Sequence, residues 1–282
     1  MSKKNIVLVG DVGGGKTVSL ETLFGGTIDF NFDEGGWRSL ERVGAQKILA
    51  QKIGRHPKEL KFASNLREWF GKKEELQKNE ILIIDYSTYS TPMSVGMLTN
   101  FDPKIYLDFA QDINHLESNA QAYKERGICH FTNDSLTGMQ WYVLHGMVNL
   151  AAHASKGTSQ YTYGLAIEKV REIVDTCCHL PFDYILTAHI AAEKDDIVGK
   201  IQETILLYGK KLPGILLSMI DDIYYASAPM MAGKKEFWFE TSPQMFLKII
   251  RQRSFDDLPI KIKPNFAEIY KEGGMVRPIE KK

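Results

Sequence analysis

Eight residues near the start of the chain have the types and spacing of a phosphate-binding loop. Gly10-Asp-Val-Gly-Gly-Gly-Lys16-Thr17 fits the pattern G-x-x-x-x-G-K-[ST]. Glycines in such a loop let the backbone curl so that successive N–H groups point at phosphate oxygens. Lys16 would reach the β- and γ-phosphates, and the hydroxyl of Thr17 would ligate Mg²⁺. The residues expected to hold the nucleotide are Gly10, Asp11, Val12, Gly13, Gly14, Gly15, Lys16, Thr17 and Val18.

The residues on both sides of this pattern agree with that chemistry. Ile6-Val-Leu-Val9 is a short apolar run that predicts a buried strand, and Val18-Ser-Leu-Glu-Thr-Leu-Phe24 has helical character. A phosphate loop joins a strand to a helix, whereas a chance glycine-rich turn needs neither neighbour. The start of the chain therefore predicts a strand, a phosphate loop and a helix.

Other features narrow the class of nucleotide-binding protein. The chain has no Asn-Lys-x-Asp run for reading guanine, and Asp196-Ile-Val-Gly199 fits D-x-x-G, a pattern short enough to arise by chance. Small-molecule kinases usually carry an arginine-rich lid late in the chain, where this sequence has the pair Arg251 and Arg253. An ATPase is therefore favoured over a GTPase or a small-molecule kinase.

Four further segments follow the phosphate loop in the order found in a known superfamily. They are Phe30-Asn-Phe-Asp-Glu-Gly-Gly36, Asp134-Ser-Leu-Thr137, Phe182-Asp-Tyr-Ile-Leu-Thr-Ala-His189 and residues 241–253. Together with the loop they resemble RecA-like ATPases, especially the small phage recombination and single-strand-annealing ATPases. The resemblance covers roughly residues 4–255. It implies a RecA-like P-loop NTPase fold that binds and hydrolyses ATP with Mg²⁺.

The resemblance implies a role for a residue at each of three strand ends. Glu34 would polarise the attacking water as general base, with Asp33 as the second candidate. Asp134 would hold the water shell of Mg²⁺, and His189 would sense the γ-phosphate. A base must lie where a water can be in line with the γ-phosphate, and a strand end beside the loop is such a place. Taken alone, the acidic pair also fits a solvated turn, and a histidine at a strand end is more often structural.

A second acidic residue competes with Asp134 for the metal. Ile81-Leu-Ile-Ile-Asp85 is a cleaner apolar run that also ends in a carboxylate. Asp134 is preferred because Ser-Leu-Thr follows it and because a helix-rich span separates it from Glu34. Asp85 stays the alternative.

The closing segment carries basic residues, which the resemblance directs toward the nucleotide of a neighbouring subunit. The candidates are Lys248, Arg251 and Arg253. A cation there would stabilise the charge on the transferring phosphoryl group. The alternative is a basic face that keeps an edge strand soluble. A cation supplied by a neighbour predicts self-association into a ring or filament and a slow isolated monomer.

Short apolar runs alternate with amphipathic segments along the chain, which predicts an α/β fold with a mostly parallel sheet flanked by helices. Strands are expected at residues 5–9, 27–32, 80–84, 128–133, 183–188 and 220–226. Apolar residues spaced by three and four predict helices over residues 105–123 and 163–177. Strand-like runs at 218–226, 236–240 and 245–250, with a turn at 232–235, predict an antiparallel C-terminal extension.

These elements predict one large domain. The RecA-like ATPase domain is expected over residues 1–255, with residues 86–127 as an insertion plus a helix. Residues 256–282 are charged and contain proline, so a C-terminal tail is expected there.

Charge and composition restrict the partners. Lysine plus arginine equal aspartate plus glutamate at 35 each, so bulk charge does not hold this protein to nucleic acid or membrane. No apolar run approaches the ~18–20 residues that span a bilayer, so no membrane partner is expected. Three cysteines without zinc spacing fit a cytoplasmic protein, in the host cytoplasm if it is phage-encoded.

The use of the ATP leaves two function classes. In RecA-like proteins two loops hold single-stranded DNA, and here these would lie near residues 154–163 and 191–214. They contain Tyr161, Tyr163, Lys194, Lys200, Lys210 and Lys211, with acids among the lysines. One class is a DNA-stimulated ATPase of phage-type recombination or replication, which the motif order favours. The other is a nucleotide-switched assembly or regulatory protein that binds no DNA, which the zero net charge favours.

Overall fold

The computed structural model describes residues 3–33, 36–41, 58–87, 103–153, 160–194, 201–209, 211–243, 249–254 and 258–272. Its strands are β1 (Asn5–Val9), β2 (Gly26–Asn31), β3 (Glu59–Ala63), β4 (Glu80–Asp85), β5 (Ile128–Asp134), β6 (Asp183–Ala188), β7 (Ile190–Lys194), β8 (Ile201–Ile205), β9 (Asp222–Ser227), β10 (Met230–Met231), β11 (Lys234–Lys235), β12 (Trp238–Glu240) and β13 (Lys261–Ile262). Its helices are α1 (Lys16–Leu20), α3 (Leu66–Gly71), α4 (Pro103–Ser118), α5 (Ala120–Glu125), α6 (Leu136–His153), α7 (Gln160–His179), α8 (Leu212–Met219), α9 (Phe266–Glu272) and the 3₁₀ helix η1 (Trp37–Ser39).

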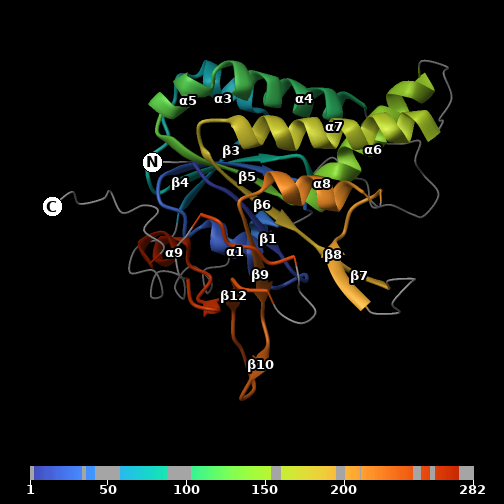
Figure 1. The fold of residues 1–282 in the computed structure, drawn as a ribbon. Coiled ribbons are helices and arrows are strands. Elements are labelled where there is room, and N and C mark those ends of the chain that lie inside the picture. Colours follow the sequence, from blue (N-terminus) through green and yellow to red (C-terminus); the bar gives the residue numbers. More distant parts are fainter. Residues whose placement is uncertain are drawn as a thin grey trace.

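A nine-stranded sheet crosses the molecule in the order β13-β12-β9-β1-β6-β5-β2-β4-β3 (Figure 1). The strands from β9 to β3 in this order pair in parallel, and β12 and β13 are added antiparallel. Parallel strands need crossover connections, which here are mostly helical. The fold is therefore a mixed α/β fold with a large, mostly parallel sheet.

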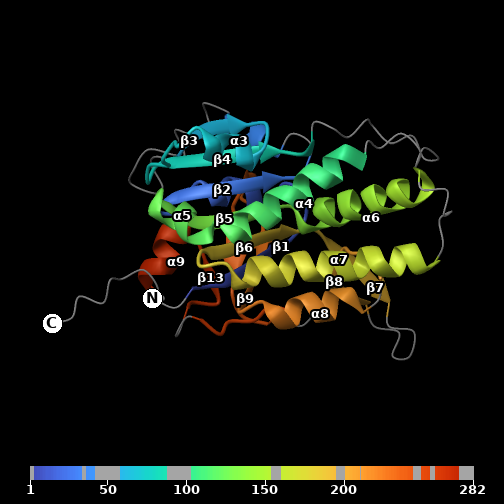
Figure 2. The same cartoon turned by 90° about the horizontal axis from the view of Figure 1, so that it is seen from above.

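Both faces of the sheet are covered. Side chains alternate along a strand, so β1 buries Val7 and Val9 in one core cluster and Ile6 and Leu8 in the other. Helices α3 to α8 pack over the first face, and α1 and α9 pack over the second (Figures 1 and 2). Because β1 is buried on both sides, the loop that follows it starts from a fixed position.

The parallel core follows the sequence prediction closely. The five expected strands from residues 5–9 to 183–188 correspond to β1, β2, β4, β5 and β6. The expected helices over 105–123 and 163–177 correspond to α4 with α5 and to α7. The helix after the glycine-rich loop is shorter than expected, since α1 ends at Leu20.

The C-terminal part of the sheet differs from the prediction in direction. The strand expected at 220–226 is β9, but β9 pairs in parallel with β1, and the antiparallel extension starts only at β12. The reason is the connection: α8 lies between β8 and β9 and returns the chain in the direction of β1, whereas the turn at 232–235 reverses it.

The expected tail and insertion are also partly integrated into the domain. Within residues 256–282, β13 pairs with β12, and α9 buries Phe266, Ile269 and Tyr270 against the second face. Their spacing of three and one gives a short apolar stripe, which the charged neighbours obscure in the sequence. Within 86–127, α4 and α5 bury Phe109, Leu116 and Tyr123 in the main core, so they form the crossover from β4 to β5.

Two small antiparallel hairpins accompany the main sheet. β7 pairs with β8, and β10 pairs with β11 in a hairpin that projects from the body of the molecule (Figure 1). In the part of the chain that the structure describes, no helix is both long and apolar enough to cross a membrane.

Candidate functional site

The glycine loop, residues Gly10–Thr17, lies at the carboxyl end of β1 between β6 and β9. Gly15 has φ of 88°, a left-handed conformation that glycine adopts without strain, and it directly precedes α1 as the N-cap residue. A Cβ on Gly14 would lie 2.7 Å from the carbonyl oxygen of Ala226 in β9. Glycine is therefore required at position 15 for the left-handed turn and at position 14 for close packing against β9.

Lys16 lies folded over the loop that it terminates. Its side chain is 6% exposed, and its Nζ donates to the carbonyl oxygens of Gly10 and Asp11, both at 2.9 Å. Burial lowers the pKa of Lys16, although the negative charges of Asp134, Asp33 and Asp11 oppose this shift. The ammonium is thus held inside the concavity of the loop, where an anion would meet it.

Thr17 and Asp134 lie in direct contact. The hydroxyl of Thr17 donates to Oδ2 of Asp134 at 2.5 Å, and Thr187 at the end of β6 donates to Oδ1. One hydroxyl and one carboxylate beside the glycine loop form an oxygen donor set that suits Mg²⁺, which keeps most of its waters and takes one or two protein ligands. The residues present therefore fit a Mg²⁺ ion bound together with phosphate.

Asp33 joins the same cluster from the end of β2. His189 Nε2 donates to its Oδ2 at 3.2 Å, and the hydroxyl of Ser135 donates to its Oδ1 at 2.7 Å. The ends of β1, β6, β5 and β2 are neighbours in the sheet, so side chains more than 150 residues apart in the chain meet here. The structure thus brings Lys16, Thr17, Asp33, Asp134 and His189 together.

The carboxylates of this cluster have different electrostatic environments. Burial alone would raise the pKa of Asp33, but hydrogen bonds from His189 and Ser135 and the charges of His189 and Lys16 lower it overall. Burial, reinforced by the charge of Asp33, raises the pKa of Asp134 despite its two hydroxyl donors. A nearby cation would relieve that cost, which is what a metal-binding carboxylate needs.

The rival carboxylate, Asp85, lies away from the glycine loop. It ends β4, on the far side of β2, where it accepts hydrogen bonds from Asn31 and Trp37, both at 2.8 Å, and from Ser87. The structure therefore places Asp134, and not Asp85, beside Thr17.

The basic candidates of the closing segment lie elsewhere. Arg251 bridges to Ile223 near the amino end of β9, and its guanidinium donates to the carbonyl oxygens of Leu217 and Ile220 at the end of α8. Arg253 is exposed and close to it in the chain, with its backbone N–H bound by Asp222. Both therefore lie near the amino end of β9, whereas the glycine loop of the same chain lies at the carboxyl end of β1.

Several predicted residues lie outside the described residues, namely Glu34, Lys248, Lys200, Lys210, the side chain of Lys194, and residues 245–248 of the strand predicted at 245–250. Of the two regions proposed for DNA, residues 154–159 and 195–200 are likewise outside. The described remainder contains β7, β8 and the first turn of α7, where Tyr161 is 73% exposed and Tyr163 is 39% exposed. Lys211 is exposed directly before α8.

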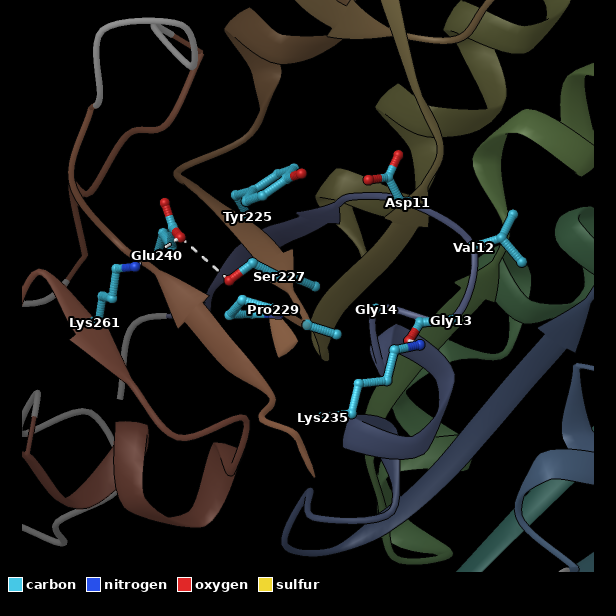
Figure 3. Close-up of a pocket in the computed structure, with 12 residues that line it drawn as sticks. Asp11, Val12, Gly13, Gly14, Tyr225, Ser227, Pro229, Lys235, Glu240 and Lys261 are labelled. Carbon is cyan, nitrogen blue, oxygen red and sulfur yellow. Dashed lines mark hydrogen bonds and ion pairs between the residues drawn. The ribbon is translucent and has the colours of Figure 1, made fainter. Parts of the chain in front are cut away.

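A pocket adjoins the glycine loop on the side of β9 (Figure 3). Its volume is about 430 Å³, and its walls include Asp11, Gly13, Tyr225, Lys235 and Glu240. Burial, with a contribution from Asp11, raises the pKa of Tyr225 to about 12, so its phenol stays neutral. The pocket and the carboxylate cluster therefore lie on opposite sides of β1.

Sequence reasoning missed the hydroxyls that orient the carboxylates and the lysine beside the loop. Thr187 and Ser135 follow the apolar parts of their strands, and a polar residue at that position is the signal that could have identified them. Asp29 in β2 is fully buried beside Asp134, and burial raises its pKa well above the usual range. Lys235 falls within the turn that the sequence predicts at 232–235.

Comparisons with known proteins add little. No model of a known protein family matches the chain, and no curated protein matches it. Among solved structures, the chain is similar to that of an uncharacterized protein from Pyrococcus horikoshii in complex with an unknown peptide. The sequence identity is 11%, with 85% of this chain and 84% of that chain covered and a TM-score of 0.35. At that level of similarity nothing about ligand or activity follows for this chain.

Proposed function

We propose that this protein binds and hydrolyses Mg·ATP as a RecA-like P-loop NTPase. The observation that carries the proposal is the contact of 2.5 Å between Thr17 Oγ1 and Asp134 Oδ2, directly after a glycine loop that holds the ammonium of Lys16. A loop of this kind with a hydroxyl and a buried carboxylate at one end has the parts that phosphoryl transfer requires. A purely structural glycine turn would not require the buried acid.

The positions of the acidic cluster and of the pocket support one orientation of the nucleotide on the glycine loop. The acids and His189 lie on the β6 side of the loop, so the phosphate that reacts would point there. The nucleoside would then extend to the β9 side, where the pocket of about 430 Å³ has room for it. The choice of ATP over GTP is supported by the resemblance and by the missing guanine motif.

Each residue has a distinct task in this proposal. The backbone N–H groups of the glycine loop and the ammonium of Lys16 would bind the phosphates. Thr17 and Asp134 would hold Mg²⁺, which when bound neutralises charge on the β- and γ-phosphate oxygens. Thr187 orients the Asp134 carboxylate by its hydrogen bond.

Hydrolysis also needs a base for the attacking water. As that water bonds to the γ-phosphorus, the bond to the β–γ bridging oxygen breaks, and the proton of the water passes to a carboxylate. The resemblance assigns this task to Glu34. Asp33, held by His189 and Ser135 and with a lowered pKa, is the second candidate. His189 would sense the γ-phosphate, and its hydrogen bond to Asp33 would link that sensing to the candidate base.

Action on single-stranded DNA, and assembly into a ring or filament, are the further parts of the proposal. The order of the motifs supports them. The alternative is a nucleotide-switched assembly protein that binds no DNA, which the zero formal net charge supports.

The test is phosphate release from Mg·ATP, with and without single-stranded DNA, for the wild type and Lys16→Ala. We expect turnover that DNA raises several-fold and that Lys16→Ala abolishes. Turnover that ignores DNA but still requires Lys16 would leave ATP hydrolysis intact and favour the assembly protein. Turnover unaffected by Lys16→Ala would contradict the proposed site. A parallel measurement with GTP tests the preference for adenine over guanine nucleotide.

A further inference from the structure

The β10–β11 hairpin contacts the glycine loop from outside the main sheet. It leaves β9 after Ser227 and returns into β12, so both of its ends are fixed beside the loop. Its tip projects into solvent, where Met230 is 67% exposed and Met231 is 52% exposed (Figure 1). The hairpin thus joins an exposed tip to a base in contact with the candidate nucleotide site.

Two residues at the base of the hairpin contact the glycines. The Nζ of Lys235 lies 3.4 Å from the carbonyl oxygen of Gly13, and Figure 3 shows its side chain reaching that part of the loop. The ring of Phe237 lies so close to Gly15 that a Cβ there would be 2.9 Å from it. Residues two apart in an extended segment point to the same side, so Lys235 and Phe237 contact the loop together.

The charge of Lys235 has no acidic partner within the described residues. The other lysine of the pocket, Lys261, forms an ion pair with Glu240 at 3.2 Å. Lys235 instead donates to a neutral backbone carbonyl at the limit of hydrogen-bond distance and lies 5.9 Å from the Phe237 ring. It is the ammonium at the mouth of the pocket that remains available to an anion.

We propose that Lys235 is a second phosphate-binding cation of the nucleotide site, supplied by the same chain through the β10–β11 hairpin. The inference rests on the proposed function, since its ligand is the triphosphate bound on the glycine loop. A phosphate oxygen is a stronger acceptor for an ammonium than a carbonyl is, so the ligand would take Lys235 from Gly13. The hairpin would then be held against the bound nucleotide.

The hairpin supplies its own control. Lys234 is the neighbour of Lys235 in β11, is also exposed, and has its side chain on the opposite side of the strand. Replacing either lysine by alanine removes one positive charge from the same hairpin, so a general effect of charge on the anionic ligand acts equally in both variants. A specific contact acts only through Lys235.

The experiment is equilibrium binding of a fluorescent ATP analogue with Mg²⁺ at two salt concentrations. We expect Lys235→Ala to weaken binding about tenfold, as for loss of one charge-assisted hydrogen bond. Lys235→Arg should retain most of the affinity, and Lys234→Ala should stay within about twofold of the wild type. The salt dependence of binding should be reduced more in Lys235→Ala than in Lys234→Ala.

The outcomes separate this inference from the proposed function. If the wild type binds the analogue, Lys16→Ala abolishes binding, and Lys235→Ala equals Lys234→Ala, then the role of Lys235 is wrong and the nucleotide site stands. If the wild type binds no nucleotide, the proposed function is wrong and the inference falls with it. Thermal unfolding of each variant without nucleotide checks that the hairpin change leaves the fold intact.

Discussion

Thr17 and Asp134 are 117 residues apart in the chain and in hydrogen-bond contact in the structure. The contact joins the loop after β1 to the end of β5. β6 lies between these two strands, and its Thr187 donates to the same carboxylate. Among the described residues, Asp134 accepts hydrogen bonds from these two hydroxyls and not from a basic side chain. At the scale of residues, this carboxylate is the group whose charge the proposed reaction needs.

Replacing Asp134 by asparagine should lower Mg-dependent ATP turnover by about 10–100-fold or more. Asparagine keeps the size of the side chain and can accept from Thr17, but it removes the charge that a cation needs. The measurement is phosphate release across a range of Mg²⁺ concentrations.

Asp85→Asn is the matched control for that prediction. Asp85 ends another strand of the same sheet but is bound by Asn31 and Trp37, so its replacement should leave turnover nearly unchanged. If Asp85→Asn were inactive and Asp134→Asn active, the assignment of the metal carboxylate would be reversed.

Glu21 gives a pH-dependent prediction. Its side chain is buried, and burial raises its pKa to about 7 in spite of the hydrogen bond from the Lys58 backbone N–H. The folded state therefore binds the proton more tightly than the unfolded state, and this contribution to stability is lost as the pH rises from about 4.5 through 7. Glu21→Gln should raise the free energy of unfolding at pH 8.5 by up to about 3 kcal/mol, and much less at pH 5.

Urea unfolding at both pH values measures the difference. Glu74→Gln is the control, because Glu74 is exposed. An equal gain from Glu21→Gln at pH 5 and pH 8.5 would show that ionisation of Glu21 is not the cause.

At the scale of elements, apolar patterning predicted what is buried and failed where strands or helices are short or polar. β1, β4 and β6 are mostly apolar runs, and β2 and β5 keep apolar residues between buried polar ones, so the sequence predicts all five strands. β3 was missed because it is an edge strand with exposed positions and a charged pair, Lys61 with Glu80. In the candidate site, the sequence predicts Asp134 and His189 at strand ends, but not the hydroxyls of Thr187 and Ser135 beside them or Lys235 on the hairpin.

The C-terminal segment shows why a charged composition does not define a tail. Three buried residues of α9 belong to the second core cluster. The other members of this cluster include residues of β1, β6 and β9, which are far away in the sequence. No local signal reports those contacts. Only the position of the sheet face under α9 makes the burial possible.

Phe266→Ala should therefore destabilise the protein by about 3–5 kcal/mol, the usual cost of removing a buried phenylalanine side chain. Phe266 is fully buried and contacts the ring of Phe239 in β12 edge to face, with centroids 5.8 Å apart. Urea unfolding measures the change. Ile260→Ala is the control, since Ile260 is 64% exposed and should cost less than about 0.5 kcal/mol. Equal effects of the two changes would mean that this segment does not pack on the core.

At the scale of the whole molecule, the site is asymmetric. The described part of one chain supplies the loop, the acids and, by our inference, one cation at the carboxyl edge of the sheet, while Arg251 and Arg253 lie toward the opposite edge. Arg251 is occupied by two carbonyls of its own chain, which favours a structural task for it. If one of these basic residues acts on bound nucleotide, as the resemblance implies, the nucleotide must be on a second copy of the chain.

The resemblance to RecA-like ATPases predicts that turnover per subunit rises with protein concentration across the assembly transition. A monomer would lack the neighbour's cation and hydrolyse ATP slowly, by a factor of up to about 10³ if that cation acts as an arginine finger. Steady-state phosphate release, with the oligomeric state followed by light scattering in the same samples, makes the comparison. Turnover per subunit that stays constant across the transition would contradict the prediction.

Calorimetric titration of Mg·ATP into the wild type and into Lys16→Ala tests directly whether Gly10–Thr17 is a nucleotide site. We predict one binding site per chain in the wild type and loss of binding in the variant. Thermal unfolding without nucleotide should show that both proteins are folded. Equal binding to both, or no binding to the wild type, would contradict the claim.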